Sequence, residues 1–272
     1  MRITNMLATP FQSLPRGFAV QRRQLLWIAI LGLGLVSCSV IPQSDSLKPT
    51  PTRENPADLY VNMAAVYLQR NQLDVALERA NQAVKVDPNS ARARYVLAIV
   101  YQKLGQEAPA EVQFRAAIER DENNADFRNA WGAILCNQKR YAEAQAQFER
   151  ALKNPLYQTP EVVLWNAADC ARRAGDRVKA ETSLRAALTA NPNFAPALLS
   201  MAEQMFEHGD AQAARFYMER YSRAGQVTAR VLLLAWRIEM QLGNKREATA
   251  LAQSLRRRFP DAPELMQLKR AK

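Results

Sequence analysis

From Ala57 onward, small and large apolar residues recur with helical spacing, and the whole pattern repeats every 34 residues. The segment "DVALERANQAVKVDPN" at 74–89, for example, returns as "VKAETSLRAALTANPN" at 178–193. Apolar positions spaced in this way predict two amphipathic helices per period, joined by a short turn. The third unit is two residues longer than the others because of "NPLYQTPE" at its end. The predicted units are 57–90, 91–124, 125–160, 161–194, 195–228 and 229–262.

Each unit keeps small residues at fixed positions, which predicts a close approach of its two helices. Position 20 is alanine in all six units, and position 8 is small in five, with Trp236 the exception. Pro88, Pro192 and Pro260 stand at position 32, where they end the second helix because proline cannot continue it. The larger side chains expected to fill the space between helices include Tyr60, Met63, Tyr67, Leu97, Tyr101, Phe114, Trp131 and Phe148.

This combination of period, small residues and terminating prolines resembles the tetratricopeptide repeat over residues 57–262. The resemblance implies an all-α, right-handed superhelical solenoid of six helix pairs, in which no unit buries its apolar face alone. Residues 263–272 are expected to form a short C-terminal capping helix. The fit is weaker in the last two units, where Tyr221 stands at position 27 and Trp236 at position 8.

In this repeat family partners usually lie in a groove lined by the first helix of each unit, at positions 2, 5, 9 and 12. The N-terminal end of that groove is apolar and contains an aromatic residue, which suits an amphipathic helix or a hydrophobic segment of a partner. Packing against neighbouring helices is the alternative role for each of these residues. The expected partner-binding residues are Val61, Ala65, Leu68, Tyr95, Ile99 and Trp165. The same positions elsewhere hold Arg92, Asn129, Asp169, Arg172, Leu199, Glu203, Phe206, Leu233, Arg237 and Met240.

The N-terminal region has a different pattern, with a basic flank followed by twelve apolar residues from Leu25 to Val36. This length fits the apolar region of a signal peptide, whereas a membrane-spanning helix needs roughly 20 residues. The sequence "LVSC" at 35–38 resembles a bacterial lipobox, which implies acylation of Cys38 and removal of residues 1–37. Ser39 after the cysteine favours the outer membrane by the usual sorting pattern. An uncleaved inner-membrane anchor is the alternative.

Residues 38–56 are expected to form the lipidated cysteine and a flexible tether. Residues 39–55 are rich in serine, threonine and proline and have no apolar period, which is typical of an extended linker. Fully stretched, such a segment reaches on the order of 55 Å. The repeats could therefore stand clear of the membrane surface.

The formal net charge of +11 raises the question of nucleic-acid binding. Arg2, Arg16, Arg22 and Arg23 precede the first acidic residue, and the remaining net charge of +7 is interleaved with Glu and Asp in helical patterns. This arrangement favours solvated helix faces over a nucleic-acid groove. We therefore expect no nucleic-acid partner.

Few residues offer chemistry. His208 is the only histidine and lies at a predicted turn, and Asp169-Cys170 lacks a histidine base for thiol catalysis. No cluster has metal-ligand spacing. The pattern predicts no enzyme, no cofactor or metal, and no small-molecule substrate.

Cys136 and Cys170 fall in the first helices of neighbouring units. Such helices pack about 8–10 Å apart, so a disulfide forms only at favourable angles. We expect two separate, largely buried thiols rather than a bridge, and the lipobox accounts for Cys38.

A lipobox, a tether and six tetratricopeptide repeats together resemble the type IV pilus biogenesis and stability lipoproteins, the PilF/PilW pilotin family. The repeat signatures are "YVNMAAVYLQRNQLDVALERANQAVKVDPN" at 60–89 and "WNAADCARRAGDRVKAETSLRAALTANP" at 165–192. The resemblance implies a periplasm-facing protein, lipid-anchored in the outer membrane. It would bind secretin subunits of the pilus pore and promote their outer-membrane localisation and multimerisation. The rival function is a lipoprotein adaptor for cell-wall enzymes or outer-membrane protein assembly.

Overall fold

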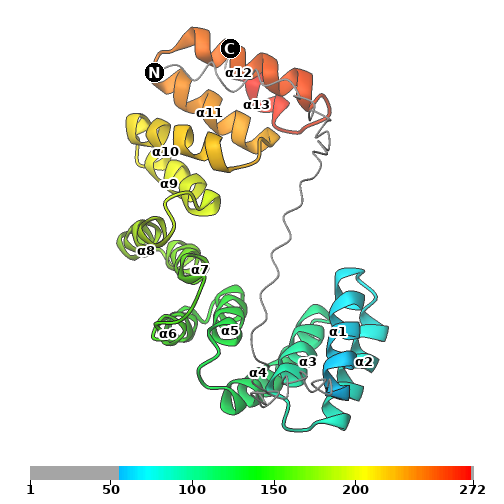
Figure 1. Ribbon diagram of the computed structural model, residues 1–272. Coiled ribbons are helices and arrows are strands. Elements are labelled where there is room, and N and C mark those ends of the chain that lie inside the picture. Colours follow the sequence, from blue (N-terminus) through cyan, green and yellow to red (C-terminus); the bar gives the residue numbers. More distant parts are fainter. Residues whose placement is uncertain (1–54, 271–272) are drawn as a thin grey trace, which may run out of the picture. The chain divides into compact units, whose positions relative to one another are not determined.

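The computed structural model describes residues 55–270, which form thirteen α-helices and no strand within that range (Figure 1). The predicted signal peptide, Cys38 and nearly all of the tether lie outside the described residues. The helices are α1 (Pro56–Gln69), α2 (Leu73–Val86), α3 (Ala91–Lys103), α4 (Glu107–Arg120), α5 (Ala125–Asn137), α6 (Tyr141–Ala151), α7 (Pro160–Arg173), α8 (Arg177–Ala190), α9 (Ala195–Glu207), α10 (Ala211–Ala224), α11 (Ala229–Gln241), α12 (Lys245–Arg258) and α13 (Leu265–Arg270).

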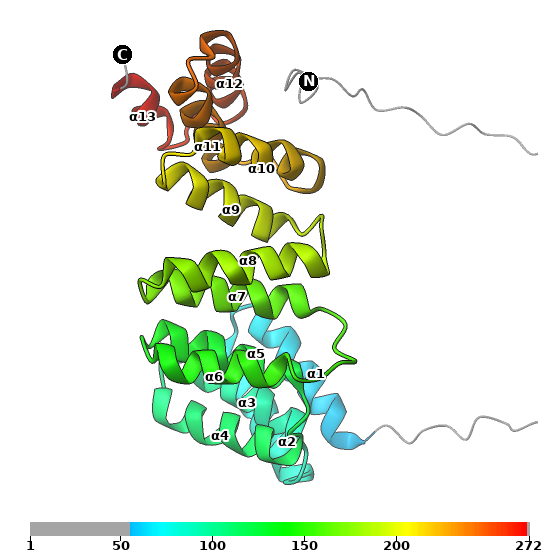
Figure 2. The same cartoon turned by 90° about the vertical axis from the view of Figure 1, so that its left-hand side faces the viewer.

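Consecutive helices pack as six pairs, and each pair contacts the next one along the chain (Figure 2). Helix α1 also contacts α3, and α5 contacts α7, so these first helices of successive pairs lie side by side. The short helix α13 packs on α12, and its Leu268 belongs to the same buried cluster as Trp236. The predicted all-α solenoid of six helix pairs with a C-terminal capping helix is confirmed.

Local signals explain where many of the helices begin. The side-chain oxygens of Asn55, Ser90 and Asn124 each accept a hydrogen bond of 3.1–3.2 Å from a backbone N–H in the first turn of the following helix. These contacts satisfy donors that have no partner inside the helix. Pro160 is the first residue of α7, where a missing N–H has no consequence.

The turn inside each pair uses the same backbone conformation. Position 15 of every unit has a positive φ, and four of the six residues there are glycines. Asn71 (φ 56°) and Lys139 (φ 62°) occupy this position in pairs one and three. A left-handed residue at this point ends the first helix and turns the chain back towards the second.

The small residues predicted between paired helices are buried, which confirms their role. All six alanines at position 20 are at most 1% exposed. Gly132 at position 8 is needed because a Cβ atom there would lie 2.7 Å from Cε1 of Phe148. Of the larger side chains, Phe114 and Phe148 are fully buried, whereas Tyr60, Met63, Tyr67 and Tyr101 are only partly buried.

The insertion in the third unit forms the loop between α6 and α7. Tyr157 in this loop donates a hydrogen bond from its hydroxyl to Asp126 of α5 (2.8 Å), and the Asn154 side chain donates to the backbone carbonyl of Asn123 (3.2 Å). The two extra residues therefore extend a loop that is fastened to the start of the same helix pair.

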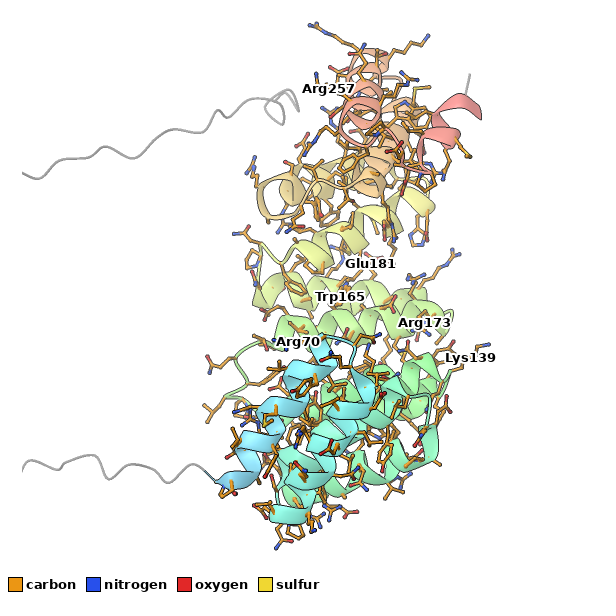
Figure 3. All side chains as sticks on the ribbon, turned by 90° about the vertical axis from the view of Figure 1, so that its right-hand side faces the viewer. Arg70, Lys139, Trp165, Arg173, Glu181 and Arg257 are labelled. Carbon is orange, nitrogen blue, oxygen red and sulfur yellow. A yellow bond between two sulfur atoms is a disulfide. The ribbon has the colours of Figure 1, made fainter. Side chains whose placement is uncertain are left out.

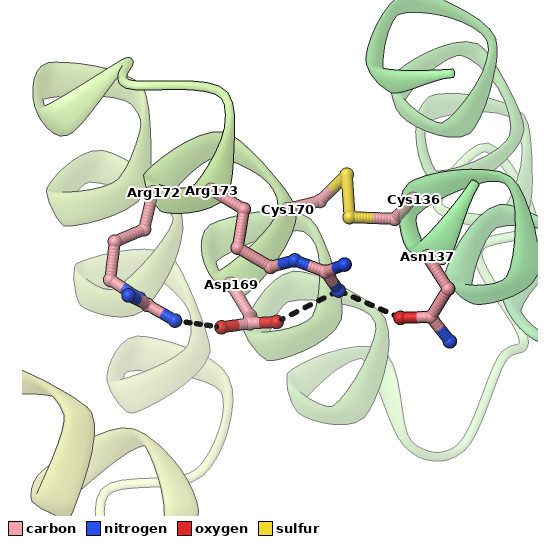
Figure 4. Close-up of a disulfide and its surroundings, with 6 residues drawn as sticks. All are labelled: Cys136, Asn137, Asp169, Cys170, Arg172 and Arg173. Atoms are coloured by element: carbon pink, nitrogen blue, oxygen red, sulfur yellow. Dashed lines mark hydrogen bonds and ion pairs between the residues drawn. A yellow bond between two sulfur atoms is a disulfide. The ribbon is translucent and has the colours of Figure 1, made fainter. Parts of the chain in front are cut away.

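The expectation of separate thiols is wrong, because Cys136 and Cys170 form a disulfide between α5 and α7 (Figure 4). Their Cα atoms are 5.7 Å apart, and both residues are buried. Arg173 lies beside the bridge and donates to Asn137 across the same boundary (2.7 Å). The helix spacing alone is too long for a bridge, but both cysteines lie on the facing sides of adjacent first helices, which brings them within reach.

Candidate functional site: two clefts along the first helices

A cleft of about 790 Å³, here called the N-terminal cleft, is bordered by α1, α3 and α5. Turn residues that precede α3 and α5 complete its rim. Its apolar lining residues include Val61, Ala65, Tyr95, Val96, Phe127 and Ala130. Its polar lining residues include Arg92, Asp121, Asn124, Asp126 and Asn129.

Tyr95 is held rigidly in the N-terminal cleft. Its ring stacks on Phe127, with centroids 4.5 Å apart, and meets Phe114 edge-on at 5.9 Å. Burial raises the pKa of the Tyr95 hydroxyl, and the nearby negative charge of Asp126 raises it further. The residue therefore offers a neutral hydroxyl on a fixed aromatic surface, a combination that favours partner contacts of mixed apolar and polar character.

At the rim of the N-terminal cleft, the positive charge is paired with an acidic residue but two negative charges are not. The guanidinium of Arg92 contacts Asp58 (3.2 Å) and Asn62 (2.8 Å) on α1. Asp126 accepts a hydrogen bond from the hydroxyl of Tyr157. Neither Asp126 nor Asp121 forms an ion pair with a described residue. The rim therefore carries uncompensated negative charge beside an apolar lining.

The predicted partner-binding residues are divided among three locations. Val61, Ala65 and Tyr95 line the N-terminal cleft, although Val61 is only 1% exposed and also belongs to the core between α1 and α3. Leu68 and Ile99 are partly buried, pack against apolar clusters, and line neither cleft described here. Trp165 lines a second cleft further along the stack.

That second cleft, here called the C-terminal cleft, has a volume of about 1070 Å³ and is bordered by the last three helix pairs. Figure 3 marks Trp165 midway along the stack, where its indole Nε1 donates to the hydroxyl of Ser200 (3.0 Å). Eight residues expected from their repeat positions meet in this cleft: Trp165, Asp169, Arg172, Leu199, Glu203, Phe206, Leu233 and Arg237.

Most charges of the C-terminal cleft are paired locally. Arg172 contacts Asp169 (2.7 Å), and Arg230 contacts Glu203 (2.6 Å). Gln204, which the repeat positions did not indicate, lines the cleft and is 5% exposed. Its side-chain nitrogen donates to the backbone carbonyl of Arg177 (3.3 Å), while its oxygen has no partner among the described residues. No sequence signal distinguishes this glutamine from a surface residue.

The described residues contain no group of three or more His, Cys, Asp or Glu that could hold a metal ion. Cys170 is disulfide-bonded, so it has no free thiol to act as a nucleophile. His208 is exposed and caps the C-terminal end of α9, at the predicted turn. Between residues 55 and 270, no helix combines the length and apolar character that crossing a bilayer requires. The lipidation predicted at Cys38 falls outside that range.

Comparison with known proteins identifies the repeat directly. Models of the TPR repeat, the tetratricopeptide repeat, match residues 55–105, 91–124 and 129–195. The type IV pilus assembly protein PilF of Pseudomonas aeruginosa is 27% identical over 245 residues, which cover 90% of this chain and 97% of PilF.

Two solved structures extend this similarity to the fold. The structure of Pseudomonas aeruginosa PilF has a TM-score of 0.70 and 28% identity, covering 79% of this chain and 97% of that one. The structure of PilW, described as a type IV pilus biogenesis factor, also has a TM-score of 0.70, with 31% identity over 78% of this chain and 98% of PilW. The chain therefore belongs to the family of tetratricopeptide-repeat type IV pilus biogenesis proteins that includes PilF and PilW.

Proposed function

We propose that this protein is a pilotin-type assembly factor, which binds secretin subunits of the type IV pilus and promotes their outer-membrane localisation and multimerisation. Its relationship to PilF and PilW along nearly its whole length carries the proposal. The two clefts on the first-helix side supply surfaces for a protein partner, which is the usual role of tetratricopeptide scaffolds.

The N-terminal cleft suits one kind of secretin segment. Its apolar lining favours an amphipathic helix or a short hydrophobic stretch. The carboxylates of Asp121 and Asp126 favour a basic residue at the edge of that segment, because they lack a cationic partner among the described residues. Binding of this kind requires no catalytic group.

A cleft-blocking variant tests this proposal. Ala65 is partly exposed in the cleft, so Ala65→Glu places a carboxylate beside apolar residues without entering the core. Val61 is unsuitable because a charge at its buried position would destabilise the fold. We expect Ala65→Glu to weaken binding to the purified periplasmic part of the secretin by at least about tenfold.

Ala146→Glu is the matched control, since Ala146 is exposed on α6 and lines neither cleft. Circular dichroism should show the same helix content for both variants. In cells, Ala65→Glu should reduce the secretin multimers seen on unheated gels, whereas Ala146→Glu should not. Normal multimers in a strain that lacks this protein would contradict the secretin proposal and favour the adaptor role.

Membrane anchoring through Cys38 is a separate part of the proposal. The mature protein should begin at an acylated Cys38 and fractionate with the outer membrane. Intact-mass measurement checks this directly. An unmodified Cys38 with residues 1–37 still attached would contradict the lipoprotein proposal, and Cys38→Ser should release the protein from the outer-membrane fraction.

A further inference from the structure

Positive charge accumulates on the second helices towards the C-terminal end of the stack. The net formal charge of the second helix is 0, −1 and −1 in the first three pairs, and +2, +2 and +4 in the last three. The largest value belongs to α12, where Lys245, Arg246 and three consecutive arginines outnumber the single Glu247. Among the second helices, positive charge is therefore greatest at the C-terminal end of the stack.

The basic residues of α12 are available for an external contact. Lys245, Arg246, Arg256, Arg257 and Arg258 are all exposed, and none forms an ion pair with a described residue. Three of the five arginines of α8 and α10 are engaged locally: Arg185 pairs with Glu181, Arg215 pairs with Glu219 and Glu239, and Arg220 donates to the backbone carbonyl of Pro192. Arg258 lies over the ring of Phe259, with 5.7 Å from its guanidinium carbon to the ring centroid. Figure 3 marks Arg257 at the end of the stack.

Helical spacing places four of these five charges along one face. At 3.6 residues per turn, the exposed side of α12 that we call the basic stripe holds Lys245, Arg246, Thr249, Gln253, Arg256 and Arg257. Arg258 lies outside this stripe. The rise of 1.5 Å per residue separates Arg246 from Arg257 by about 16 Å. Lys245 and Arg246 stand at the positive end of the helix dipole, where cations do not stabilise a helix. Helix stability therefore gives no reason for these two cations.

The form of this surface favours a planar layer of anions. No residue of α12 lines either cleft, so neither cleft offers the stripe an apolar recess for the anchor side chain of a protein partner. Phospholipid head groups need only accessible cations. The choice of a membrane as occupant also rests on the proposed anchor at Cys38, which would keep the repeats within the reach of the tether.

We propose that the exposed basic stripe of α12 binds the anionic head groups of a phospholipid bilayer. This contact supplements the acyl anchor and is independent of secretin binding. A juxtamembrane lipid anchor and a basic patch together hold a protein more firmly than either one alone. The contact would also hold the C-terminal end of the stack at the membrane. Both clefts would remain free to bind protein partners, because no residue of α12 lines either of them.

The test uses the repeat region, residues 55–272, without an acyl chain. This region holds the four apolar clusters of the described residues, and the solved PilF and PilW chains, matched over 97% and 98% of their lengths, cover 79% and 78% of this chain. We therefore expect it to fold as a unit. We expect sedimentation with vesicles that contain phosphatidylglycerol and no binding to vesicles of phosphatidylcholine alone. Binding should weaken as the salt concentration rises.

The triple variant Arg246→Gln, Arg256→Gln and Arg257→Gln should weaken binding to the anionic vesicles by about 100-fold. The control variant Lys139→Gln, Arg150→Gln and Lys153→Gln removes the same charge from three exposed positions of pair three and should bind normally. Equal loss in both variants, or no vesicle binding by the wild type, would overturn the proposal. Binding of polyglutamate but not of vesicles would assign the stripe to an acidic protein. Intact-mass measurement of Cys38 and secretin binding are separate readouts, so a failure here leaves them unaffected.

Discussion

Side-chain size at positions 8 and 24 is complementary within the helix pairs. Four pairs combine a small residue at position 8 with a larger one at position 24, as in Gly132 with Phe148 and Ala202 with Met218. The last pair reverses the sizes, with Trp236 at position 8 and Ala252 at position 24, both in one buried cluster. The reversal keeps the total side-chain volume between the two helices similar. It explains why the last unit has Trp236 at position 8, where the other units have a small residue.

Gly132→Ala should destabilise the protein by about 1 kcal/mol. A Cβ atom 2.7 Å from Cε1 of Phe148 forces the ring to move, at about 1–3 kcal/mol, while alanine improves helix propensity by about 1 kcal/mol. Urea denaturation measures the balance. In a Phe148→Leu background the same substitution should stabilise instead. A wild-type midpoint for the single variant would refute the packing explanation.

Lys139→Gly should stabilise the protein by about 0.5–1 kcal/mol. The left-handed conformation of Lys139 (φ 62°) costs an L-residue about 1–2 kcal/mol, and the greater freedom of glycine in the unfolded chain offsets part of that gain. Gly105→Ala is the converse control, because no atom lies within 4 Å of a Cβ placed there and only the backbone (φ 74°) resists it. In thermal denaturation, the Tm should rise for Lys139→Gly and fall for Gly105→Ala.

At the scale of elements, neighbouring pairs are joined by contacts of different strength. The disulfide between Cys136 and Cys170 links pairs three and four covalently. Pairs two and three share Glu111 of α4, which accepts hydrogen bonds from Arg140 (2.6 and 3.2 Å) and Arg115 (2.7 and 3.1 Å). Both contacts add to the apolar packing between units, and hydrogen bonds such as that from Asn166 to Asn129 (2.9 Å) also cross the boundary between pairs three and four.

Removing the disulfide should lower the free energy of unfolding by about 2–4 kcal/mol, since the bridge closes a loop between residues 34 apart. In a stack of repeats, weaker coupling between pairs three and four should also broaden the transition. Guanidinium denaturation of Cys136→Ser/Cys170→Ser measures both effects. Reductant should move the wild-type midpoint towards that of the variant and leave the variant unchanged. An insensitive wild type would show that the bridge contributes nothing.

Stability should fall in acid partly because of Glu111. Hydrogen bonds from Arg140 lower the pKa of its carboxyl to about 2, with Arg115 adding to the effect and burial opposing it. The contribution of a carboxyl with a lowered pKa is complete above its unfolded pKa of about 4.5 and is lost as the pH falls towards 2. Glu111→Gln should therefore be less stable than the wild type at neutral pH, by about 1 kcal/mol. This difference in the free energy of unfolding should shrink as the pH falls from about 4.5 to about 2. A constant difference across this range would assign the effect to packing.

The helix pairs were predictable because their signals are local: a 34-residue period, alanine at position 20, and prolines that end helices. The disulfide was not, since it depends on which sides of α5 and α7 face each other after packing. The same limit applies to the clefts. Repeat position correctly suggested that Trp165 and Phe206 border open space, but it did not show that Val61 is covered by neighbouring side chains.

For the whole molecule, a stack of this kind leaves an apolar surface at each end. At the C-terminal end that surface is covered by α13, whose Leu268 is buried with Leu232, Leu233 and Leu255 in the last cluster. Each pair contacts mainly its neighbours, so damage at one end should remain local. The capping helix has only six residues, and isolated helices of that length are unstable in water. Its stability therefore comes from this packing rather than from helix propensity.

Leu268→Ala should therefore destabilise the last pair selectively. The lost burial of a leucine costs about 2–5 kcal/mol at a well-packed site, and a terminal helix should lie near the lower value because it can rearrange. Hydrogen exchange should accelerate in α11 and α12 while α1 to α6 remain protected. Met266→Ala is the matched control, since Met266 is 66% exposed on the same helix and should leave exchange unchanged. Uniform acceleration along the chain would instead mean that the six pairs unfold as one cooperative unit, with the cap stabilising the entire stack.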